Sequence, residues 1–243
     1  MQRVIVFGNG QPAETNYFFL THSLLYEVAA FTVDRAYIKE NKLFGLPVVP
    51  FEDIESIYSP NEYKMSLLMS YRNLNKLRAE KYYQAKEKGY ELISYVSPHA
   101  VTWPGLVIGD NCFIGDYSVI SPFVEIGNNI QICSGSNVGH HCVIKDHCFI
   151  SPGAVILGSA TIEPYCLIGA NSTIRDGGIT IARECIIGAG VLINANTKER
   201  GVYINKRPEL LSKPSDKLST LLTWAMKPHK PGRAPGPKER EKK

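Results

Sequence analysis

Between residues 108 and 193 an aliphatic side chain recurs at every sixth position, with one extra residue inserted at Gly177–Gly178. An α-helix would repeat its apolar positions about every 3.6 residues and an ordinary strand about every 2, so neither explains this spacing. Three hexads make one coil of a triangular prism, with a short parallel strand on each side. The pattern therefore predicts a mainly β fold, a parallel β-helix of about five coils. The repeated aliphatics are Ile108, Ile114, Ile120, Ile126, Ile132, Val138, Ile144, Ile150, Ile156, Ile162, Ile168, Ile174, Ile181, Ile187 and Ile193.

Most of the cysteines fit the same repeat. They stand two positions before an aliphatic, where strand alternation also points a side chain inward, and serine or alanine fills this position in other hexads. We therefore interpret them as small core residues rather than as nucleophiles, metal ligands or disulfide partners, and we expect the last three to stack in one ladder. These residues are Cys112, Cys142, Cys148, Cys166 and Cys185.

The residues before the repeat have the pattern of a small α/β domain resembling a Rossmann fold. Residues 72–88 have a helical period, with Leu74, Leu77 and Tyr82 predicted to face inward. Short apolar runs predict strands at 3–7, 26–32, 48–51, 65–69 and 91–96.

We accordingly divide the chain into an α/β domain (1–98), a β-helix (99–200) and a C-terminal region (201–243). In the last region, 208–225 is predicted to form a helix, and the charged tail rich in Pro and Gly is expected to be disordered. The tail 226–243 holds seven Lys and Arg against two Glu, so it accounts for the net charge of +4. The rest of the chain lacks the general basic character that nucleic-acid binding requires.

The N-terminus and the lengths of the apolar runs indicate where in the cell the protein is expected. No apolar run reaches the roughly 18 residues of a membrane span, and the N-terminus does not have the pattern of a signal peptide. We therefore expect a cytoplasmic protein without a membrane span.

Candidate chemistry within the repeat is concentrated at His140 and His141, which follow the aliphatic Val138 at a predicted coil corner. Imidazole has a suitable pKa to remove a proton from the acceptor in acyl transfer from a thioester. A merely polar corner, a zinc site formed by histidines that meet across a subunit interface, and an inert scaffold remain open as alternatives. His147, predicted to lie between Asn129 and Tyr165, is expected to be structural or at an interface.

A second candidate is the segment Gly8–Asn9–Gly10, which directly follows the first predicted strand. It has two of the glycines of a phosphate-binding turn, and Asp34 follows the second strand, where dinucleotide-binding folds place an acidic residue. An ordinary turn with a surface aspartate remains an equal alternative.

The strand with Gly8 and Gly10, the strand ending near Asp34, and the hexads carrying His140 together resemble the sugar acetyltransferases of bacterial glycan pathways. This group includes the sialic acid O-acetyltransferases and the nucleotide-linked amino-sugar N-acetyltransferases, and the resemblance covers about residues 2–200. It implies left-handed winding, a homotrimer, and acetyl-CoA or another acyl-CoA bound between neighbouring prisms. It also implies a nucleotide-linked amino sugar held partly by the N-terminal domain, and a role in lipopolysaccharide or other surface-glycan synthesis. We expect no metal, because no carboxylate–histidine pattern in the sequence demands zinc.

This resemblance assigns the catalytic base to His140. The usual Glu or Asp beside the base is His141 here, so His141 remains a second candidate, and the family histidine nine residues after the base is Phe149. Acyl-CoA contacts are matched by Gly158, Ala170 and Ala189, and the repeat predicts that Gly158 stacks over His140. Nucleotide-sugar contacts are matched by Gly8, Asn9, Gly10, Asp34 and Arg35.

The sequence thus predicts an acyl-CoA-dependent N-acyltransferase that acts on a nucleotide-linked deoxyamino sugar. A sugar O-acetyltransferase is the nearest alternative. A non-catalytic scaffold and a zinc-dependent hydratase are alternatives of other classes.

Overall fold

The computed structural model describes residues 1–205. The helix predicted at 208–225 and the basic tail lie outside the described residues, and the domain division at residue 98 stays a prediction. Among residues 1–205, no helix is long and apolar enough to cross a membrane.

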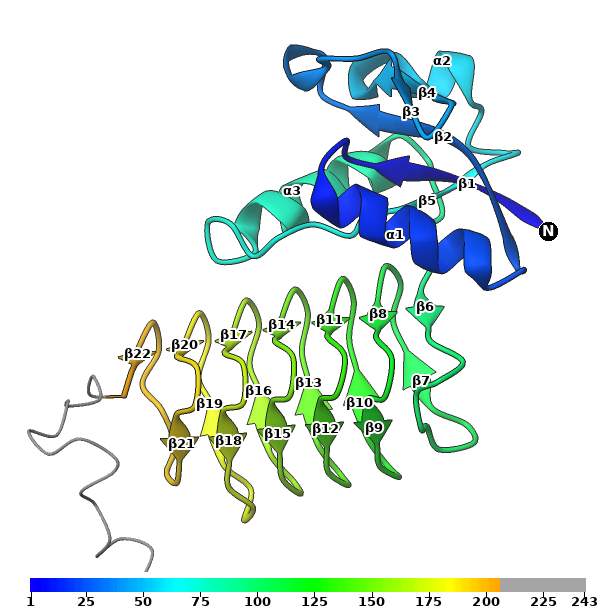
Figure 1. The fold of residues 1–243 in the computed structure, drawn as a ribbon. Coiled ribbons are helices and arrows are strands. Elements are labelled where there is room, and N and C mark those ends of the chain that lie inside the picture. Colours follow the sequence, from blue (N-terminus) through cyan, green and yellow to red (C-terminus); the bar gives the residue numbers. More distant parts are fainter. Residues whose placement is uncertain (206–243) are drawn as a thin grey trace, which may run out of the picture. The chain divides into compact units, whose positions relative to one another are not determined.

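The repeat forms the predicted left-handed parallel β-helix, a prism with a parallel sheet on each of its three sides (Figure 1). The β7 sheet contains β7 (Val107–Ile108), β10 (Glu125–Ile126), β13 (Val143–Ile144), β16 (Thr161–Ile162) and β19 (Thr180–Ile181). The β9 sheet contains β9 (Val119–Ile120), β12 (Asn137–Val138), β15 (Val155–Ile156), β18 (Thr173–Ile174) and β21 (Leu192–Ile193). The β6 sheet contains β6 (Tyr95–Val96), β8 (Phe113–Ile114), β11 (Gln131–Ile132), β14 (Phe149–Ile150), β17 (Leu167–Ile168), β20 (Ile186–Ile187) and β22 (Val202–Tyr203).

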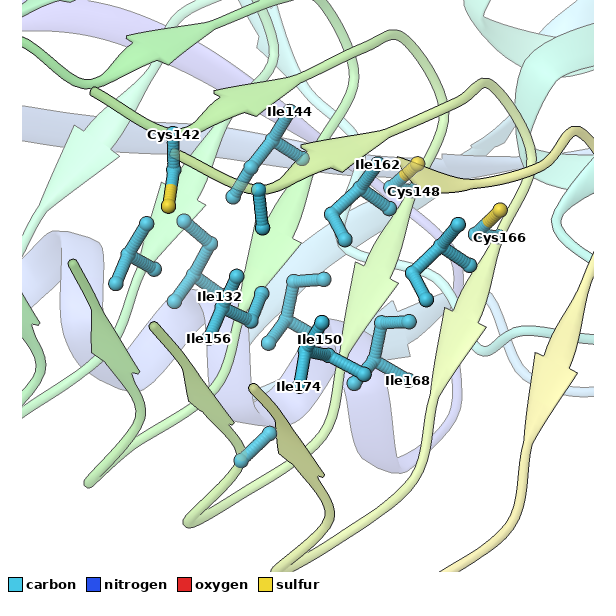
Figure 2. Packing of buried hydrophobic residues seen from close by; sticks show 14 of the residues in the cluster. Ile132, Cys142, Ile144, Cys148, Ile150, Ile156, Ile162, Cys166, Ile168 and Ile174 are labelled. Atoms are coloured by element: carbon cyan, nitrogen blue, oxygen red, sulfur yellow. The ribbon is translucent and has the colours of Figure 1, made fainter. Parts of the chain in front are cut away.

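The predicted register is confirmed by the strand pairing. Ile126 pairs with Ile144, eighteen residues on, whereas Ile162 pairs with Ile181 because the insertion at Gly177–Gly178 lengthens that coil by one residue. The second residue of nearly every two-residue strand points into the prism and is buried (Figure 2). The predicted cysteines are confirmed as core residues: all five are buried, and every cysteine of the chain is a free thiol.

The N-terminal residues fold around a five-stranded sheet in the order β3–β4–β2–β1–β5, parallel except for β3. Its strands are β1 (Gln2–Phe7), β2 (Tyr26–Val33), β3 (Lys42–Leu43), β4 (Leu46–Pro50) and β5 (Lys64–Ser66). Its helices are α1 (Gln11–His22), α2 (Ile54–Ile57) and α3 (Lys76–Glu87), and 3-10 turns occupy Arg35–Tyr37 and Phe51–Asp53.

Three details of this region differ from the sequence prediction. The helix α1 was not predicted; its aromatic residues at 17–19 do not follow a clear helical period. The run 91–96 contributes only β6 and one bridge from Leu92 to Met65. The last helix starts at Lys76 rather than Arg72, because the three preceding residues adopt left-handed backbone conformations, and Leu77 is exposed rather than inward.

The buried face of α3 carries an arginine that packs against the prism. Arg78 is fully buried, and its Nη2 donates hydrogen bonds to the backbone carbonyls of Asn129, His147 and Cys148 at 3.0–3.1 Å. A helical pattern of apolar residues could not predict this contact, because the side chain that faces inward is charged. The arginine fixes α3 to the corner between the β7 and β6 sheets.

Candidate active site

The two candidate histidines lie at the corner that joins β12 to β13. Backbone hydrogen bonds between coils hold this corner: His141 N–H donates to the Pro122 carbonyl, and Ser159 N–H donates to the His140 carbonyl. His141 has a left-handed backbone with φ of 58°, a conformation shared by the equivalent residues of the coils on either side. Both side chains are exposed, so both imidazoles project from the prism edge.

The two imidazoles contact each other directly. Their Nδ1 atoms lie 3.1 Å apart and their rings are almost perpendicular. The other face of His141 packs on Phe123, with ring centroids 4.7 Å apart, and Phe123 in turn packs on Trp103. Because Phe123 supports His141, the pair has a defined orientation even though it is exposed.

The predicted stacking of Gly158 over His140 is present. A Cβ atom built on Gly158 would lie 2.6 Å from Cε1 and 2.7 Å from Nε2 of His140, much closer than atoms can approach. The imidazole of His140 therefore occupies the space that any larger residue at position 158 would fill.

The other predicted acyl-CoA positions lie elsewhere on the same chain. Ala170 and Ala189 occupy the corner between the β6 and β9 sheets, where Gly190 N–H donates to the Ala170 carbonyl at 2.8 Å. Gly158 lies at the opposite end of the β9 sheet strands. A single chain thus brings Gly158 to His140 and Ala170 to Ala189, but it does not bring the two pairs together.

The predicted nucleotide turn joins β1 to α1. Gly8 has φ of 107°, and a Cβ there would lie 3.2 Å from Cβ of Ala13, so glycine suits both the backbone and the packing. Gly10 is the N-cap of α1, where no side chain caps the helix and the space around the glycine is open. In the first turn of α1, Pro12 has no N–H, and the N–H groups of Ala13 and Glu14 donate to the Gly10 carbonyl. The N–H groups that could meet an anionic ligand are therefore those of the turn itself and of Gln11.

The side chains predicted around this turn are engaged within the protein. Asn9 donates to the Tyr37 carbonyl at 2.8 Å, and Asp34 accepts from the buried Lys81 at 2.6 Å. Arg35 forms an ion pair with Asp53. The turn therefore presents mainly its backbone to the surroundings.

A pocket of about 390 Å³ opens beside Gly8 and Gly10. It lies at the carboxyl ends of the adjacent strands β1 and β5, whose following segments lead to opposite sides, to β2 and to the bridge of Leu92 with Met65. Open parallel sheets bind ligands at such a point. Arg72, which follows β5, lines it and is exposed. Arg72 was not among the predicted residues, although its place after the fourth predicted strand is the signal that could have indicated it.

Three other titratable side chains of the prism, those of His147, Cys112 and Cys142, are buried. Burial lowers the pKa of His147 to about 4, so this imidazole is neutral near pH 7. Its Nδ1 lies 2.9 Å from Asn129 Nδ2 and its ring stacks on Tyr165, which confirms the predicted ladder. Burial also raises the pKa of Cys112 to about 11 and that of Cys142 above its ordinary value, so neither thiol is an ionised nucleophile at neutral pH.

Within the described part of the chain, no three His, Cys, Asp or Glu side chains gather in an arrangement that could hold a metal ion.

Comparison with known families identifies the repeat. Residues 105–140 and 141–176 match the family of the bacterial transferase hexapeptide (six repeats), and residues 160–195 match the hexapeptide repeat of succinyl-transferase. Over 105 residues the chain is 36% identical to the GDP-perosamine N-acetyltransferase of Escherichia coli O157:H7. The match covers 41% of this chain and 47% of that protein, so the chain spans about half the length of this curated relative.

Solved structures resemble the fold over most of the chain. The acetyltransferase domain of PglB from Neisseria gonorrhoeae FA1090 has a TM-score of 0.75 at 21% identity, covering 83% of this chain and 96% of that domain. PerB from Caulobacter crescentus, solved with CoA and GDP-perosamine, has a TM-score of 0.73 at 21% identity, with coverages of 83% and 93%. At these identities the likeness establishes the fold.

Proposed function

We propose, from the premise that the prism belongs to the hexapeptide-repeat transferases, that this protein is an acyl-CoA-dependent N-acyltransferase. It moves an acetyl group from acetyl-CoA to the amino group of a nucleotide-linked deoxyamino sugar. The observation that carries this proposal is His140, an exposed imidazole held against Gly158 at an edge of the prism. The curated relative, which acts on GDP-perosamine by name, supports the class of acceptor.

In this reaction His140 is the general base. The acceptor nitrogen attacks the thioester carbonyl, His140 Nε2 takes the proton that the nitrogen loses, and the carbon–sulfur bond breaks to release CoA. A general base whose pKa lies near the working pH typically raises the rate of such a step by about 10²- to 10⁴-fold. A corner backbone N–H stabilises the negative charge on the carbonyl oxygen.

The contact between the two Nδ1 atoms gives His141 a positioning role. When His140 Nδ1–H donates to His141 Nδ1, the lone pair of His140 is on Nε2, which is the tautomer that can accept a proton. His141 then accepts the hydrogen bond from the base, which is the role of the acidic residue usual at this position in the family it resembles. The reverse tautomers would leave His140 Nε2 protonated and unable to act.

The split acyl-CoA positions favour a homotrimer. Acyl-CoA lies between two prisms, with Gly158 contributed by one chain and Ala170 and Ala189 by its neighbour, since these corners are apart within one chain. Small residues at all three positions leave room for the narrow pantetheine arm.

The diphosphate of the acceptor binds at Gly8–Asn9–Gly10, where it meets the backbone N–H groups of Asn9, Gly10 and Gln11 and the charge of Arg72. Asp34 and Arg35 follow β2 and pair with Lys81 and Asp53, and their contact with the nucleoside stays a prediction from the resemblance. Cytoplasmic location stays a prediction from the N-terminus and the apolar runs, and a role in surface-glycan synthesis stays a prediction from the resemblance.

The test is acyl transfer by full-length variants His140→Asn and His141→Asn, measured separately by thiol release, with His99→Asn as the control. His99 is another exposed prism histidine that stacks on a neighbouring ring. We expect His140→Asn to lower kcat by at least about 100-fold and His99→Asn to leave it unchanged.

For His141, the informative pair is His141→Glu and His141→Leu. A glutamate can accept the Nδ1–H of His140 and should keep more activity than leucine, which cannot. Near-normal kcat in His140→Asn would reject the assignment of the base, and equal losses in the two His141 variants would reject the positioning role.

A further inference from the structure

Exposed apolar side chains form a band across one end of the β9 sheet. At the edge of this sheet towards the β7 sheet, Phe123 is 64% exposed and packs on Trp103, with ring centroids 6.2 Å apart. At the opposite edge, in the same coil, Tyr117 is 73% exposed. Exposed Val101 lies between the two edges, bridged to Val119 of β9. A contiguous apolar band of this kind is typical of a surface that another molecule covers.

The rest of the β9 sheet also presents an uncharged outer face. The outward side chain of each of its strands is neutral and is exposed or half-buried. Interfaces between protein chains are depleted in charged residues and enriched in aromatic ones at their centres. The composition of this face therefore fits a protein partner. The outward residues are Val119, Asn137, Val155, Thr173 and Leu192.

The two edges of the band are the same two edges that carry the proposed acyl-CoA contacts. Gly158 lies on the edge of Phe123, and Ala170 and Ala189 lie on the edge of Tyr117. A ligand shared by two parallel copies joins the first edge of one copy to the second edge of the other, and repetition of that contact closes a ring. The same contact brings Tyr117 of one copy to Phe123 of its neighbour, because both residues flank β9. The partner that fits the band is thus a second copy of this chain.

We propose that Tyr117 of a neighbouring copy packs on Phe123 and Trp103 and thereby positions the histidine pair of another chain. A hollow of about 260 Å³ lies beside these two rings and receives the incoming tyrosine. Phe123 packs on His141 with ring centroids 4.7 Å apart, and Nδ1 of His141 lies 3.1 Å from Nδ1 of His140. Contacts therefore lead from the neighbouring copy to the base, and the site is complete only in the assembled protein. This inference rests on the proposed function, because it takes His140 as the base and a second copy as its neighbour at the acyl-CoA.

The first experiment measures acetyl transfer by Tyr117→Ser and Tyr117→Phe in the full-length protein. Removing the ring should lower kcat by about 5- to 10-fold, the equivalent of one aromatic contact, with little change in KM for the acceptor. Tyr117→Phe keeps the ring and should retain wild-type kcat. Phe18→Ser, which removes another exposed aromatic side chain on α1, is the matched control and should leave kcat unchanged. Wild-type kcat in Tyr117→Ser would overturn the proposal.

Mixed oligomers test whether Tyr117 acts across the interface. Tyr117→Ser and His140→Asn chains with different tags are co-expressed, and species carrying both tags are isolated. In a closed ring of three copies, every mixed species has one site with His140 from the Tyr117→Ser chain and Tyr117 from the His140→Asn chain. Acetyl transfer should therefore reach about a third of the wild-type value, above that of either variant alone.

The matched pair combines Phe123→Ser with His140→Asn. It should not recover, because Phe123 supports the histidines of its own chain. Absence of recovery in the Tyr117→Ser pair, or equal recovery in the two pairs, overturns the proposal.

Chemical cross-linking separates this inference from the proposed function. A short bismaleimide should join copies of the Tyr117→Cys/Phe123→Cys protein into a covalent trimer. Each single substitution should leave the chains unlinked, because its new thiol has no equivalent thiol opposite, and it also controls for the native cysteines. If no acceptor is acetylated, the proposed function fails, and linkage in the double variant alone still supports the contact between copies. Acetyl transfer by the wild type without linkage in the double variant overturns the contact and leaves the proposed function standing.

Discussion

Replacing Gly158 by alanine places a methyl carbon where the His140 imidazole now lies. The added Cβ would be 2.6 Å from Cε1 and 2.7 Å from Nε2 of that ring. Carbon atoms in contact are about 3.5 Å apart or more, so the imidazole must move by about 1 Å. Because His140 is exposed, the ring can rotate away, and the cost to the free energy of unfolding should be under about 1 kcal/mol.

Catalysis should respond more strongly than stability. A displacement of about 1 Å from the reacting atoms can cost about 100-fold in rate. We therefore expect Gly158→Ala to lower kcat about 100-fold in the thiol-release assay, while its thermal unfolding midpoint stays close to that of the wild type.

Gly139→Ala, at the residue before His140, is the comparison for stability. A Cβ there would lie 2.8 Å from the backbone N of Gly158 and 3.0 Å from the carbonyl carbon of Leu157, and backbone atoms within the prism cannot rotate away. This variant should be measurably less stable. A Gly158→Ala enzyme with wild-type kcat would refute the assignment of His140 as the base at this position.

Three further predictions concern stability, measured by denaturant unfolding. Ile156→Ala, which leaves a cavity at a fully buried position of the prism, should lower the free energy of unfolding by about 3 kcal/mol. Val155→Ala, on the outer face of the same strand, should lower it by under about 1 kcal/mol. Equal losses would contradict the alternation of inward and outward side chains. Burial lowers the pKa of His147 from 6.5 to about 4. Between these two values the unfolded state binds one more proton than the folded state, so the free energy of unfolding should fall as the pH drops from about 6.5 to about 4. A His147→Asn variant with the same pH dependence would contradict this. Arg78→Lys should lower the free energy of unfolding by about 2 kcal/mol, because the shorter lysine side chain cannot bring its nitrogen to the three prism carbonyls that Arg78 Nη2 contacts. No larger loss than in exposed Arg175→Lys would contradict it.

The prism could be predicted from sequence almost residue by residue. Its repeat is local, since each hexad carries its own inward aliphatic, and the insertion at Gly177–Gly178 shifts the register by one residue as expected. The stacking of Gly158 on His140 followed from the same repeat. Handedness could not be derived from spacing and came from the family resemblance.

The N-terminal region was harder to predict because its packing is not local. Arg78 faces inward because backbone carbonyls some 50 to 70 residues away in the sequence accept its hydrogen bonds. No local sequence pattern indicates such distant partners. The burial of Gln131 was missed for a similar reason: it occupies the outward position of a repeat strand, which is polar by default, and α1 together with the segment after β5 covers it. The sequence shows that His140 and His141 are neighbours, but it could not predict that their Nδ1 atoms face each other.

The most direct measurement of the central claim is thiol release from acetyl-CoA by the wild-type protein, with UDP-, dTDP- and GDP-linked amino sugars offered in turn. The account predicts release that depends on the acceptor, with the product carrying one new acetyl group on nitrogen by mass spectrometry. Release that no acceptor accelerates, or an acetyl group found on oxygen, would contradict it.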